Sequence, residues 1–405
     1  MQYAPMIPSL IDQDMYKFSM GQAILHQFPG HTSKWAFKCR NKNVYFTPEM
    51  VQEIREQIQH YCTLRFKPDE LAFLSRIKWM KPDYIAYLRI WHPMFEDFVI
   101  GTDDPCGLTI EFEGSWVNVS PYETPVLAIV NETYFRMAHN YEELLISFDE
   151  KLDDKFDKLK YGKWYIGNFS DFGFRRRLSF EAQEHMIRKF AHLNDTMHCP
   201  SRFIGTSDVY FAYKHGLLPT GTQAHEWTMG AGQGNRMYEP SYSNHFAMEA
   251  WVREYQTMNG TALTDTIGTD TFLLDFDLAF ANLFAGVRHD SGDPFVWGDK
   301  FIKHYERLGI DPKTKTLLFS DSLNFERATE IFEYFRGKVM FGAGIGTYLT
   351  NDTCVDPLNI VVKPIEFNGL PVAKISDSPG KGMCRDDEYV PYLQRCIDWR
   401  LKHAA

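Results

Sequence analysis

The sequence predicts a parallel α/β barrel with a smaller mixed α+β domain beside it. From Trp164 onward, about seven strand-like segments alternate with helix-like ones, which is the pattern of repeated βαβ units. The first 125 residues instead combine short helical patterns with turn-punctuated strands, as α+β domains do. We therefore assign residues 126–354 to the barrel and residues 1–125, completed by 355–405, to the smaller domain.

The smaller domain should begin with a helix. Asp12 and Asp14 stand before an apolar pattern that starts at Met15, an arrangement typical of a capped helix. Tyr16 on this helix is first interpreted as a core aromatic residue. The sequence then predicts a strand over 34–39, a helix from Pro48, short helices over 67–77 and 81–90, and strands at FVIG, LTIEFEG and WVNVS.

The barrel region opens with long helical patterns over 125–140 and 141–160. Strand and helix patterns then follow in pairs: YIGNFSDFG with 180–193, RFIGT with 208–215, a strand before His225 with 242–257, ALTDT with 268–283, AGVRHDSG with 295–308, TLLFSDS with 324–336, and KVMFGAGIG alone. After Asn359, IVVKPIEF, a turn at Gly369 and LPVAKIS predict a hairpin that returns to the N-terminal sheet.

The stretch 202–227 joins two expected strand ends, one at Ser207 and one at His225. Parallel barrels bind ligands where their strands end, so these two side chains should face one pocket. A single histidine is more often structural than catalytic, but small residues from Gly221 onward leave room for a ligand beside His225. We expect Glu226 or another carboxylate to fix the tautomer of His225.

Composition and charge exclude several classes of protein. Hydrophobic residues make up 44% and charged residues 24% of the chain, and the formal net charge of −10 disfavours a nucleic-acid partner. The seven cysteines include no CxxC pair, which indicates reduced thiols in the cytoplasm. The chain has neither a secretory signal nor a run of about 18 apolar residues, so we expect neither secretion nor membrane insertion.

The motif DFGFRRR, over 171–177, follows an expected strand. Phe172 offers an aromatic face and Arg175 a guanidinium group, a combination that suits a planar aromatic carboxylate. An exposed basic patch is an equally good interpretation of this motif taken alone.

The loop RHDSGDP, over 288–294, is the most crowded polar loop of the chain. Arg288 can bind phosphate, and Asp290 can meet ribose hydroxyls, a metal-bound oxygen or developing positive charge. SDSL at 320–323 and FGAGIGT at 341–347 follow later strands, where backbone N–H groups can bind an anion. The chain has no GxxxxGK[ST] motif, so a nucleoside triphosphate would be bound without a P-loop.

Six motifs in this order resemble the nicotinate phosphoribosyltransferase family: DQDMYKFSM, DFGFRRR, GTSDVYFA, GTQAHEW, RHDSGDP and FGAGIGT. The resemblance spans nearly the whole chain. It implies an irregular α/β barrel of the type II phosphoribosyltransferase fold and a homodimer with active sites at the subunit interface. It also implies that nicotinate and 5-phosphoribosyl 1-diphosphate give nicotinate mononucleotide and diphosphate in NAD salvage, with coupled ATP hydrolysis and with Mg²⁺ on the diphosphates.

On the pyridine side, the resemblance implies that Phe172 and Tyr16 sandwich the ring. Tyr16 would come from the neighbouring subunit, Arg175 would hold the carboxylate, and Ser207 would lie beside the ring substituent. The family's commoner pattern has asparagine at position 208, where this chain has aspartate. Little depends on that difference, because Ser207 is the residue expected near the substituent.

On the donor side, the resemblance implies that Arg288 and Asp290 contact the phosphoribosyl donor. ATP would phosphorylate His225, and no residue is assigned as a metal ligand. The backbone that would cradle the 5-phosphate lies around Ser322, Gly344, Gly346 and Thr347.

Three other interpretations stay open at this point. A nicotinamide phosphoribosyltransferase resembles the same pattern but has an acid in place of Ser207, which would repel a carboxylate. A metal-dependent barrel hydrolase could use His225, His289, Asp290 and Asp321, although the chain has no HxH or HExxH pair. A non-catalytic pyridine- or phosphate-binding protein would need neither the histidine nor the full polar loop.

Overall fold

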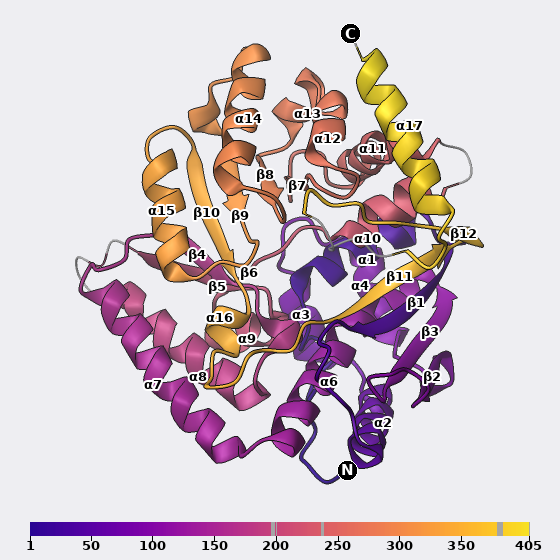
Figure 1. Ribbon diagram of the computed structural model, residues 1–405, viewed down its shortest axis with the longest axis vertical. Helices are drawn as coiled ribbons and strands as arrows, with labels where there is room; N and C mark the ends of the chain where they lie inside the picture. Colours follow the sequence, from indigo (N-terminus) through magenta and orange to yellow (C-terminus); the bar gives the residue numbers. More distant parts are fainter. Residues whose placement is uncertain (196–198, 200, 236–238, 379–383, 405) are drawn as a thin grey trace.

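Two β-sheets organise the chain (Figure 1). The computed structural model describes the chain apart from residues 196–198, 200, 236–238, 379–383 and 405. A five-stranded antiparallel sheet has the order β12-β11-β1-β3-β2, and a seven-stranded parallel sheet has the order β6-β5-β4-β10-β9-β8-β7. The expected combination of a parallel α/β barrel and a smaller antiparallel sheet is thereby confirmed, whereas the domain boundary near residue 125 stays a prediction.

The antiparallel sheet joins the two ends of the chain. Its strands are β1 (Thr32–Cys39), β2 (Phe98–Gly101), β3 (Thr109–Ser115), β11 (Ile360–Phe367) and β12 (Leu370–Pro371). β11 pairs along the whole of β1, from Ser33 opposite Phe367 to Cys39 opposite Ile360. The predicted return of the C-terminal hairpin to the N-terminal sheet is therefore confirmed.

One strand predicted for this sheet is wrong. WVNVS begins a short helix, α5 (Trp116–Val119), which runs into a 3₁₀ turn. Trp116, Val117 and Val119 are buried and Asn118 is exposed, which is the pattern of one helical turn. A strand would have placed Trp116 and Asn118 on the same face.

The parallel sheet is an incompletely closed barrel. Its strands are β4 (Asn168–Asp171), β5 (Arg202–Thr206), β6 (Leu218–Pro219), β7 (Thr261–Leu263), β8 (Gly286–His289), β9 (Thr316–Phe319) and β10 (Met340–Ile345). Within the described ranges β6 and β7 share no backbone ladder. The gap is instead bridged by Thr222, whose hydroxyl donates a hydrogen bond to the carbonyl of Thr261 at 2.8 Å.

The helices largely follow the predicted ranges. They are α1 (Met15–Gln27), α2 (Pro48–Thr63), α3 (Pro68–Leu74), α4 (Pro82–Ile90), α6 (Glu123–Ala138), α7 (Tyr141–Lys160), α8 (Phe180–Ala191), α9 (Val209–His215), α10 (His225–Thr228), α11 (Ser243–Tyr255), α12 (Thr269–Asp275), α13 (Leu278–Leu283), α14 (Pro294–Arg307), α15 (Phe325–Phe335), α16 (Thr347–Thr350) and α17 (Tyr389–His403). The single helix predicted over 268–283 is two helices, because the Asp277 carboxylate caps α13 by accepting from Phe280 N. None of the helices in the described part of the chain is long and apolar enough to cross a membrane.

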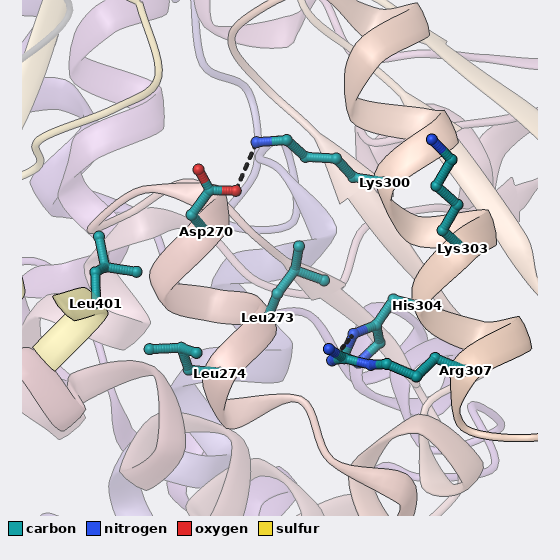
Figure 2. A pocket seen from close by; sticks show the side chains of 8 residues that line it. All are labelled: Asp270, Leu273, Leu274, Lys300, Lys303, His304, Arg307 and Leu401. Atoms are coloured by element: carbon teal, nitrogen blue, oxygen red, sulfur yellow. Dashed lines mark hydrogen bonds and ion pairs between the residues drawn. The ribbon is translucent and has the colours of Figure 1, made fainter. Parts of the chain in front are cut away.

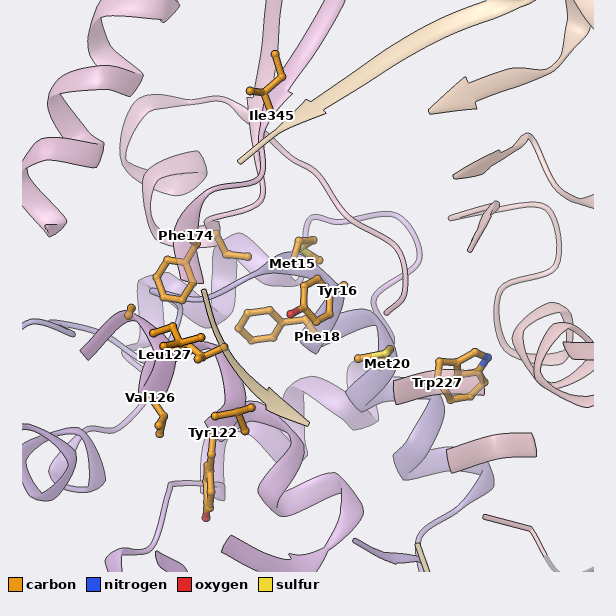
Figure 3. Packing of buried hydrophobic residues seen from close by; sticks show 14 of the residues in the cluster. Met15, Tyr16, Phe18, Met20, Tyr122, Val126, Leu127, Phe174, Trp227 and Ile345 are labelled. Atoms are coloured by element: carbon orange, nitrogen blue, oxygen red, sulfur yellow. The ribbon is translucent and has the colours of Figure 1, made fainter. Parts of the chain in front are cut away.

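The helix α1 lies in the core between the two sheets (Figure 1). Its residues from Met15 to Ile24 are all buried. Figure 3 shows Tyr16 and Phe18 of α1 near Phe174, which follows β4. The polar side chains of α1 are therefore buried near the edge of the barrel. Buried polar groups need hydrogen-bond partners, so these side chains should bond to other buried groups.

Candidate active site

The carboxyl ends of the parallel strands bring most of the predicted site residues to one edge of the barrel. Each strand is parallel to its neighbours, so the loops that follow them emerge on the same side. The predicted residues in these loops are Phe172 after β4, Ser207 after β5, Asp290 after β8, Ser322 after β9 and Gly346 after β10. The topology therefore brings these loops together at one edge of the barrel, and the roles of the residues in them stay predictions.

His225 does not end a strand as predicted, because β6 stops at Pro219 and His225 is the first residue of α10. Gly221 in the intervening loop has φ of +131°, a conformation that extended L-residues do not adopt. The loop still carries His225 to the strand ends, because its imidazole contacts Asp290 after β8.

The imidazole of His225 lies in a compact set of charged groups. Its Nε2 is 2.9 Å from Asp290 Oδ2 and 2.6 Å from Lys374 Nζ, and its Nδ1 is 3.1 Å from the hydroxyl of Thr266. Asp265 Oδ1 lies 3.7 Å from Nε2. Burial and the ammonium of Lys374 lower the pKa of His225 to about 4, so the ring is neutral at pH 7.

Of the carboxylates that the prediction allowed, Asp290 rather than Glu226 contacts the imidazole of His225, and Thr266 and Lys374 are its other polar partners. Glu226 points away, toward Lys17 Nζ at 2.6 Å and Trp116 Nε1 at 2.7 Å. In one neutral tautomer Nε2 of His225 donates to Asp290 Oδ2; in the other, Nδ1 donates to the Thr266 hydroxyl and the lone pair of Nε2 accepts from Lys374. The second tautomer presents a nucleophilic nitrogen beside a cation.

Arg288 is fixed by its neighbours at the same edge. Its Nε donates to the Ser320 hydroxyl at 3.1 Å, its NH1 donates to the Gln223 carbonyl at 3.1 Å, and its NH2 donates to Asp290 Oδ1 at 3.2 Å. Burial raises the pKa of Asp290, but Arg288 and His225 outweigh burial and hold that pKa well below its ordinary value. The Asp290 carboxylate is therefore ionised and held in place.

A second group of polar side chains surrounds Arg175, after β4. Its side chain is 40% exposed, with its guanidinium carbon 5.9 Å from the ring centre of Tyr16. Its NH1 lies 3.6 Å from Glu123 and its Nε 3.7 Å from Asp14. Arg177 of the same motif is fully buried and forms a bidentate ion pair with Asp12 at 2.8 Å, so its guanidinium is committed to the protein interior.

Tyr16 contacts Arg175 of its own chain, with the guanidinium carbon 5.9 Å from the ring centre, and the entry of Tyr16 into a neighbouring subunit's site stays a prediction. The backbone N–H of Met15 donates to the Ser207 carbonyl at 2.7 Å, which holds the start of α1 against the end of β5 within one chain. Ser207 is 3% exposed, and its hydroxyl donates to Asp14 Oδ1 at 2.5 Å. The hydroxyl of Tyr16 is buried without a hydrogen-bond partner among the described residues.

The glycine run after β10 has two different roles. A side chain at Gly344 would place its Cβ 2.3 Å from the ring of Phe172, so this glycine makes room for the aromatic face. Gly346 precedes α16, whose first residue is Thr347. Of the glycines in this run, Gly346 rather than Gly344 therefore stays a candidate for the predicted phosphate cradle, together with Thr347.

Ser322, after β9, has φ of +50°, which is uncommon for a residue with a side chain. Its hydroxyl donates to Asp321 at 3.0 Å and the residue is exposed. Strained loop conformations of this kind are concentrated at binding sites, and an anion site is one such case.

Several charged residues at this edge were not found from the sequence. Arg40, Arg176 and Lys363 have no carboxylate partner within the described parts of the chain, and Arg40 NH2 is buried without a hydrogen bond there. Burial and the positive charges of Arg175 and Arg40 lower the pKa of Arg176 to about 10. Burial and the positive charges of Lys374 and Arg40 lower the pKa of Lys363 to about 7. Cations that depress each other's pKa form a site for a polyvalent anion.

A cavity of about 410 Å³ lies between outer helices, and none of the predicted site residues lines it (Figure 2). In that cavity Lys300 is paired with Asp270 at 2.5 Å, and Arg307 donates to Nδ1 of His304 at 3.0 Å. The chemistry is therefore assigned to the strand ends, where the neutral histidine and the cations meet.

The fold and the site together define an enzyme that acts on phosphorylated substrates. A parallel barrel with a neutral histidine, two carboxylates and excess cations at its strand ends can bind and stabilise developing charge on such substrates. The comparisons with known proteins identify which family of such enzymes this is.

Residues 168–399 match the nicotinate phosphoribosyltransferase (NAPRTase) family, and residues 11–131 match the N-terminal domain of that family. The curated nicotinate phosphoribosyltransferase of Cupriavidus necator is 44% identical over 393 residues, which cover 96% of this chain and 97% of the relative. That of Acinetobacter baylyi is 44% identical over 400 residues, which cover 97% of this chain and 96% of the relative. The chain therefore belongs to the nicotinate phosphoribosyltransferase family.

Solved structures agree with this assignment. The nicotinate phosphoribosyltransferase of Vibrio cholerae superposes with a TM-score of 0.87 at 37% identity, covering 97% of this chain and 94% of the other. A putative nicotinate phosphoribosyltransferase from Saccharomyces cerevisiae gives 0.89 at 32% identity, covering 98% and 100%. The resemblance found in the sequence is confirmed, and the interpretations as a barrel hydrolase or a non-catalytic binding protein are set aside.

Proposed function

We propose that this enzyme transfers the phosphoribosyl group of 5-phosphoribosyl 1-diphosphate to the ring nitrogen of nicotinate, as a step of NAD salvage. The observation that carries the proposal is the meeting of two anion sites at one barrel edge. One contains Arg175 and Ser207, and the other contains His225, Arg288 and the cations near Lys363. The names of relatives that align over nearly the whole chain support the same reaction.

The pyridine site fits a flat carboxylate. The half-exposed guanidinium of Arg175 can donate two parallel hydrogen bonds to a carboxylate. Tyr16 lies beside Arg175, and Phe172 in the same loop supplies the second aromatic face. Ser207 carries a hydroxyl where a nicotinamide-using enzyme would carry an acid, which favours nicotinate.

The transfer itself needs positioning and charge stabilisation. Departure of diphosphate leaves positive charge on the ribose ring, and the pyridine nitrogen already has a lone pair, so no base is required. The ionised Asp290 would stabilise the positive charge, and Arg288 would hold the donor phosphates. The backbone at Ser322, Gly346 and Thr347 would cradle the 5-phosphate.

The residues present fit a magnesium ion bound together with the diphosphate. Asp265 Oδ1 is a buried oxygen without a hydrogen-bond partner in the described ranges, and the Asp290 carboxylate lies close to it. Carboxylate and phosphate oxygens are the ligands that Mg²⁺ prefers, so Asp265 and Asp290 would hold the ion. When bound, it would neutralise charge that develops on the leaving diphosphate.

His225 is proposed to accept a phosphoryl group from ATP. Its neutral ring offers the lone pair of Nε2, and Lys374 at 2.6 Å would pair with the phosphoryl oxygens. The added negative charge would then hold Arg40, Lys363 and other cations around the donor, and hydrolysis of the phosphohistidine would release them.

Compartment and oligomer remain predictions. We place the enzyme in the cytoplasm, supported by seven free thiols that a reducing compartment preserves. A homodimer in which Tyr16 enters the neighbouring subunit's site is retained as a prediction, beside the observed contact of Tyr16 with Arg175 of its own chain.

The function is tested by incubating the enzyme with labelled nicotinate, the phosphoribosyl donor and Mg²⁺, with and without ATP. We expect nicotinate mononucleotide in both cases, with faster formation and release of ADP when ATP is present. Labelled nicotinamide in a parallel reaction should be a poor substrate. Product from neither pyridine would overturn the proposal.

Replacing His225 separates its role from the transfer. His225→Ala should abolish ATP hydrolysis and acid-labile phosphate on the protein, while slow ATP-independent formation of nicotinate mononucleotide continues at high substrate concentration. ATP-stimulated turnover in this variant would show that another residue accepts the phosphoryl group. A folded variant without any product would place His225 in the transfer itself.

A further inference from the structure

Asp14 is a buried carboxylate at the wall of the pyridine site. Its side chain is 3% exposed, and its Oδ1 accepts the hydroxyl hydrogen of Ser207 at 2.5 Å. Its Oδ2 is buried and has no hydrogen-bond partner among the described residues, with Arg175 Nε 3.7 Å away. Oδ1 of Asp14 is therefore occupied by the hydrogen bond from Ser207, whereas Oδ2 faces Arg175 and can still form a hydrogen bond.

This arrangement is unfavourable for an anionic substrate as long as Asp14 and Glu123 both stay ionised. A nicotinate carboxylate on Arg175 would bring a second negative group next to Asp14, and Glu123 already lies 3.6 Å from the same guanidinium. Carboxylates that share one buried site cannot all stay ionised, because the like charge raises the pKa of one of them. One proton must therefore enter the site with the substrate.

Asp14 is the carboxylate whose surroundings favour protonation. Glu123 has the ammonium of Lys17 as an ion-pair partner at 2.6 Å. Asp14 has only the more distant Arg175, and burial raises its pKa to about 6, with Glu123 and Asp171 adding to the rise and Arg175 and Ser207 opposing it.

The other charged groups near Asp14 do not offer it a cation. Asp208 forms an isolated backbone bridge with Asp14, but its carboxylate accepts from Tyr210 N at 2.9 Å and pairs with Arg177 at 3.4 Å. Tyr16 is the second residue of α1, two positions after Asp14, and its hydroxyl is neutral because burial raises its pKa.

We propose that Asp14 takes up one proton from solvent when nicotinate binds, and that the protonated Oδ2 then donates a hydrogen bond to the substrate carboxylate. One O–H bond forms on Asp14 and no covalent bond to substrate forms or breaks. Asp14 changes from −1 to neutral, so the charge of Arg175 is left for the substrate. The inference rests on the proposed function and makes Asp14 a positioning and specificity residue of that reaction.

The same proton distinguishes two pyridines. Nicotinamide carries a neutral amide whose N–H groups can donate to an ionised Asp14, so its binding requires no proton uptake. The preference for nicotinate should therefore be greatest near pH 6 and should decline as the pH rises, because ionised Asp14 repels only the carboxylate.

Calorimetry on the unmodified enzyme measures the proton directly. Nicotinate binding is titrated at pH 7.5 in two buffers with different ionisation enthalpies, and the difference in heat gives the number of protons taken up. We expect close to one proton with nicotinate and close to none with nicotinamide. Nicotinate binding without proton uptake would overturn the inference.

Two isosteric variants then identify the group. In the unmodified enzyme the KM for nicotinate should rise by up to about tenfold for each pH unit above about 6, since one proton is required. Asp14→Asn keeps the shape and a donor, so its KM should stay flat with pH and its proton uptake should disappear. Glu123→Gln is the matched control and should keep both the slope and the uptake.

The outcomes separate this inference from the function itself. If the enzyme turns over nicotinate but binds it without proton uptake, only the role of Asp14 is wrong. If Glu123→Gln rather than Asp14→Asn removes the uptake, the proton belongs to Glu123 and the inference also falls. If labelled nicotinate is not turned over at all, the proposed function fails first.

Discussion

At position 207 a single hydroxyl donor lies beside the pyridine site. Ser207→Asp would set a second carboxylate against Asp14, whose Oδ1 now accepts the Ser207 hydroxyl at 2.5 Å. We expect kcat/KM for nicotinate to fall by about one to two orders of magnitude and to improve for nicotinamide relative to nicotinate. Steady-state assays with both pyridines measure this, with Ser207→Ala as the control that removes the hydroxyl without adding charge. An unchanged preference would remove residue 207 from the site.

The individual site residues were predictable where they stand in a short motif near a strand end. Asp290 directly follows β8 and Arg288 lies within β8, whereas His225 was named from its motif although it begins α10. Asp265 also follows a strand and was within reach of the same rule. Lys374 was not, because it lies 149 positions from His225 in an apolar hairpin pattern, and only the folded chain brings its ammonium to 2.6 Å from the imidazole.

At the scale of elements, β10 fits against the loop after β4 through Gly344. Gly344→Ala would place a methyl group 2.3 Å from the Phe172 ring, so the ring must move from the pyridine site. We expect KM for nicotinate to rise about tenfold or more and stability to fall by roughly 1–3 kcal/mol. Thermal unfolding and nicotinate kinetics measure the two effects.

The control for this change lies on the same strand. Gly342→Ala would meet the flexible side chain of Leu318 at 3.2 Å and that of Thr316 at 3.9 Å, so kinetics and stability should change little. Equal nicotinate kinetics in the two variants would show that the position of Phe172 does not matter for the substrate.

Short elements were the least predictable from sequence. The apolar spacing of WVNVS fits both a strand and one helical turn, and burial of Trp116 against Trp227 decides for the helix. The end of the two-residue strand β6 could not be predicted either, because the sequence after Pro219 contains no pattern that marks the end of a strand there. Longer units such as β10 with α15 were predicted correctly, since their apolar periodicity extends over more residues.

At the scale of the whole molecule, the parallel barrel was predictable from the alternation of strand and helix patterns, and the return of the C-terminal hairpin from its two strand patterns around Gly369. The cation cluster was not, since it forms where the antiparallel sheet meets the barrel edge. Arg40 follows β1, Lys363 lies on β11 and Arg176 follows β4. No single segment contains enough of this cluster to reveal a site for polyvalent anions.

Lys363 should be necessary for function and costly for stability. Burial, together with the nearby cations Lys374 and Arg40, lowers the pKa of Lys363 from 10.5 to about 7. Lys363 therefore destabilises the folded protein most below about pH 7, and this destabilisation decreases as the pH rises toward 10.5. Lys363→Met should raise the free energy of unfolding by roughly 1–2 kcal/mol at pH 7 and lower kcat/KM for the donor about ten- to a hundredfold. Denaturation at pH 7 and pH 10 checks the sign, with exposed Lys38→Met on β1 as the control. Greater stability of the unmodified enzyme at pH 7 would contradict this account.

Whether one chain contains a complete pyridine site is tested by mixing two inactive variants. Tyr16 contacts Arg175 of its own chain, and the start of α1 is hydrogen bonded to the end of β5 in that chain. If Tyr16 serves only its own chain, each site in an assembly of Tyr16→Ala with Asp290→Ala contains one defect, and nicotinate mononucleotide formation does not recover. If Tyr16 instead served a neighbouring subunit, a mixed dimer would contain one site with both defects and one intact site. Subunit exchange must first be demonstrated with differently tagged chains, and recovered activity after proven exchange would show that the site is built from two chains.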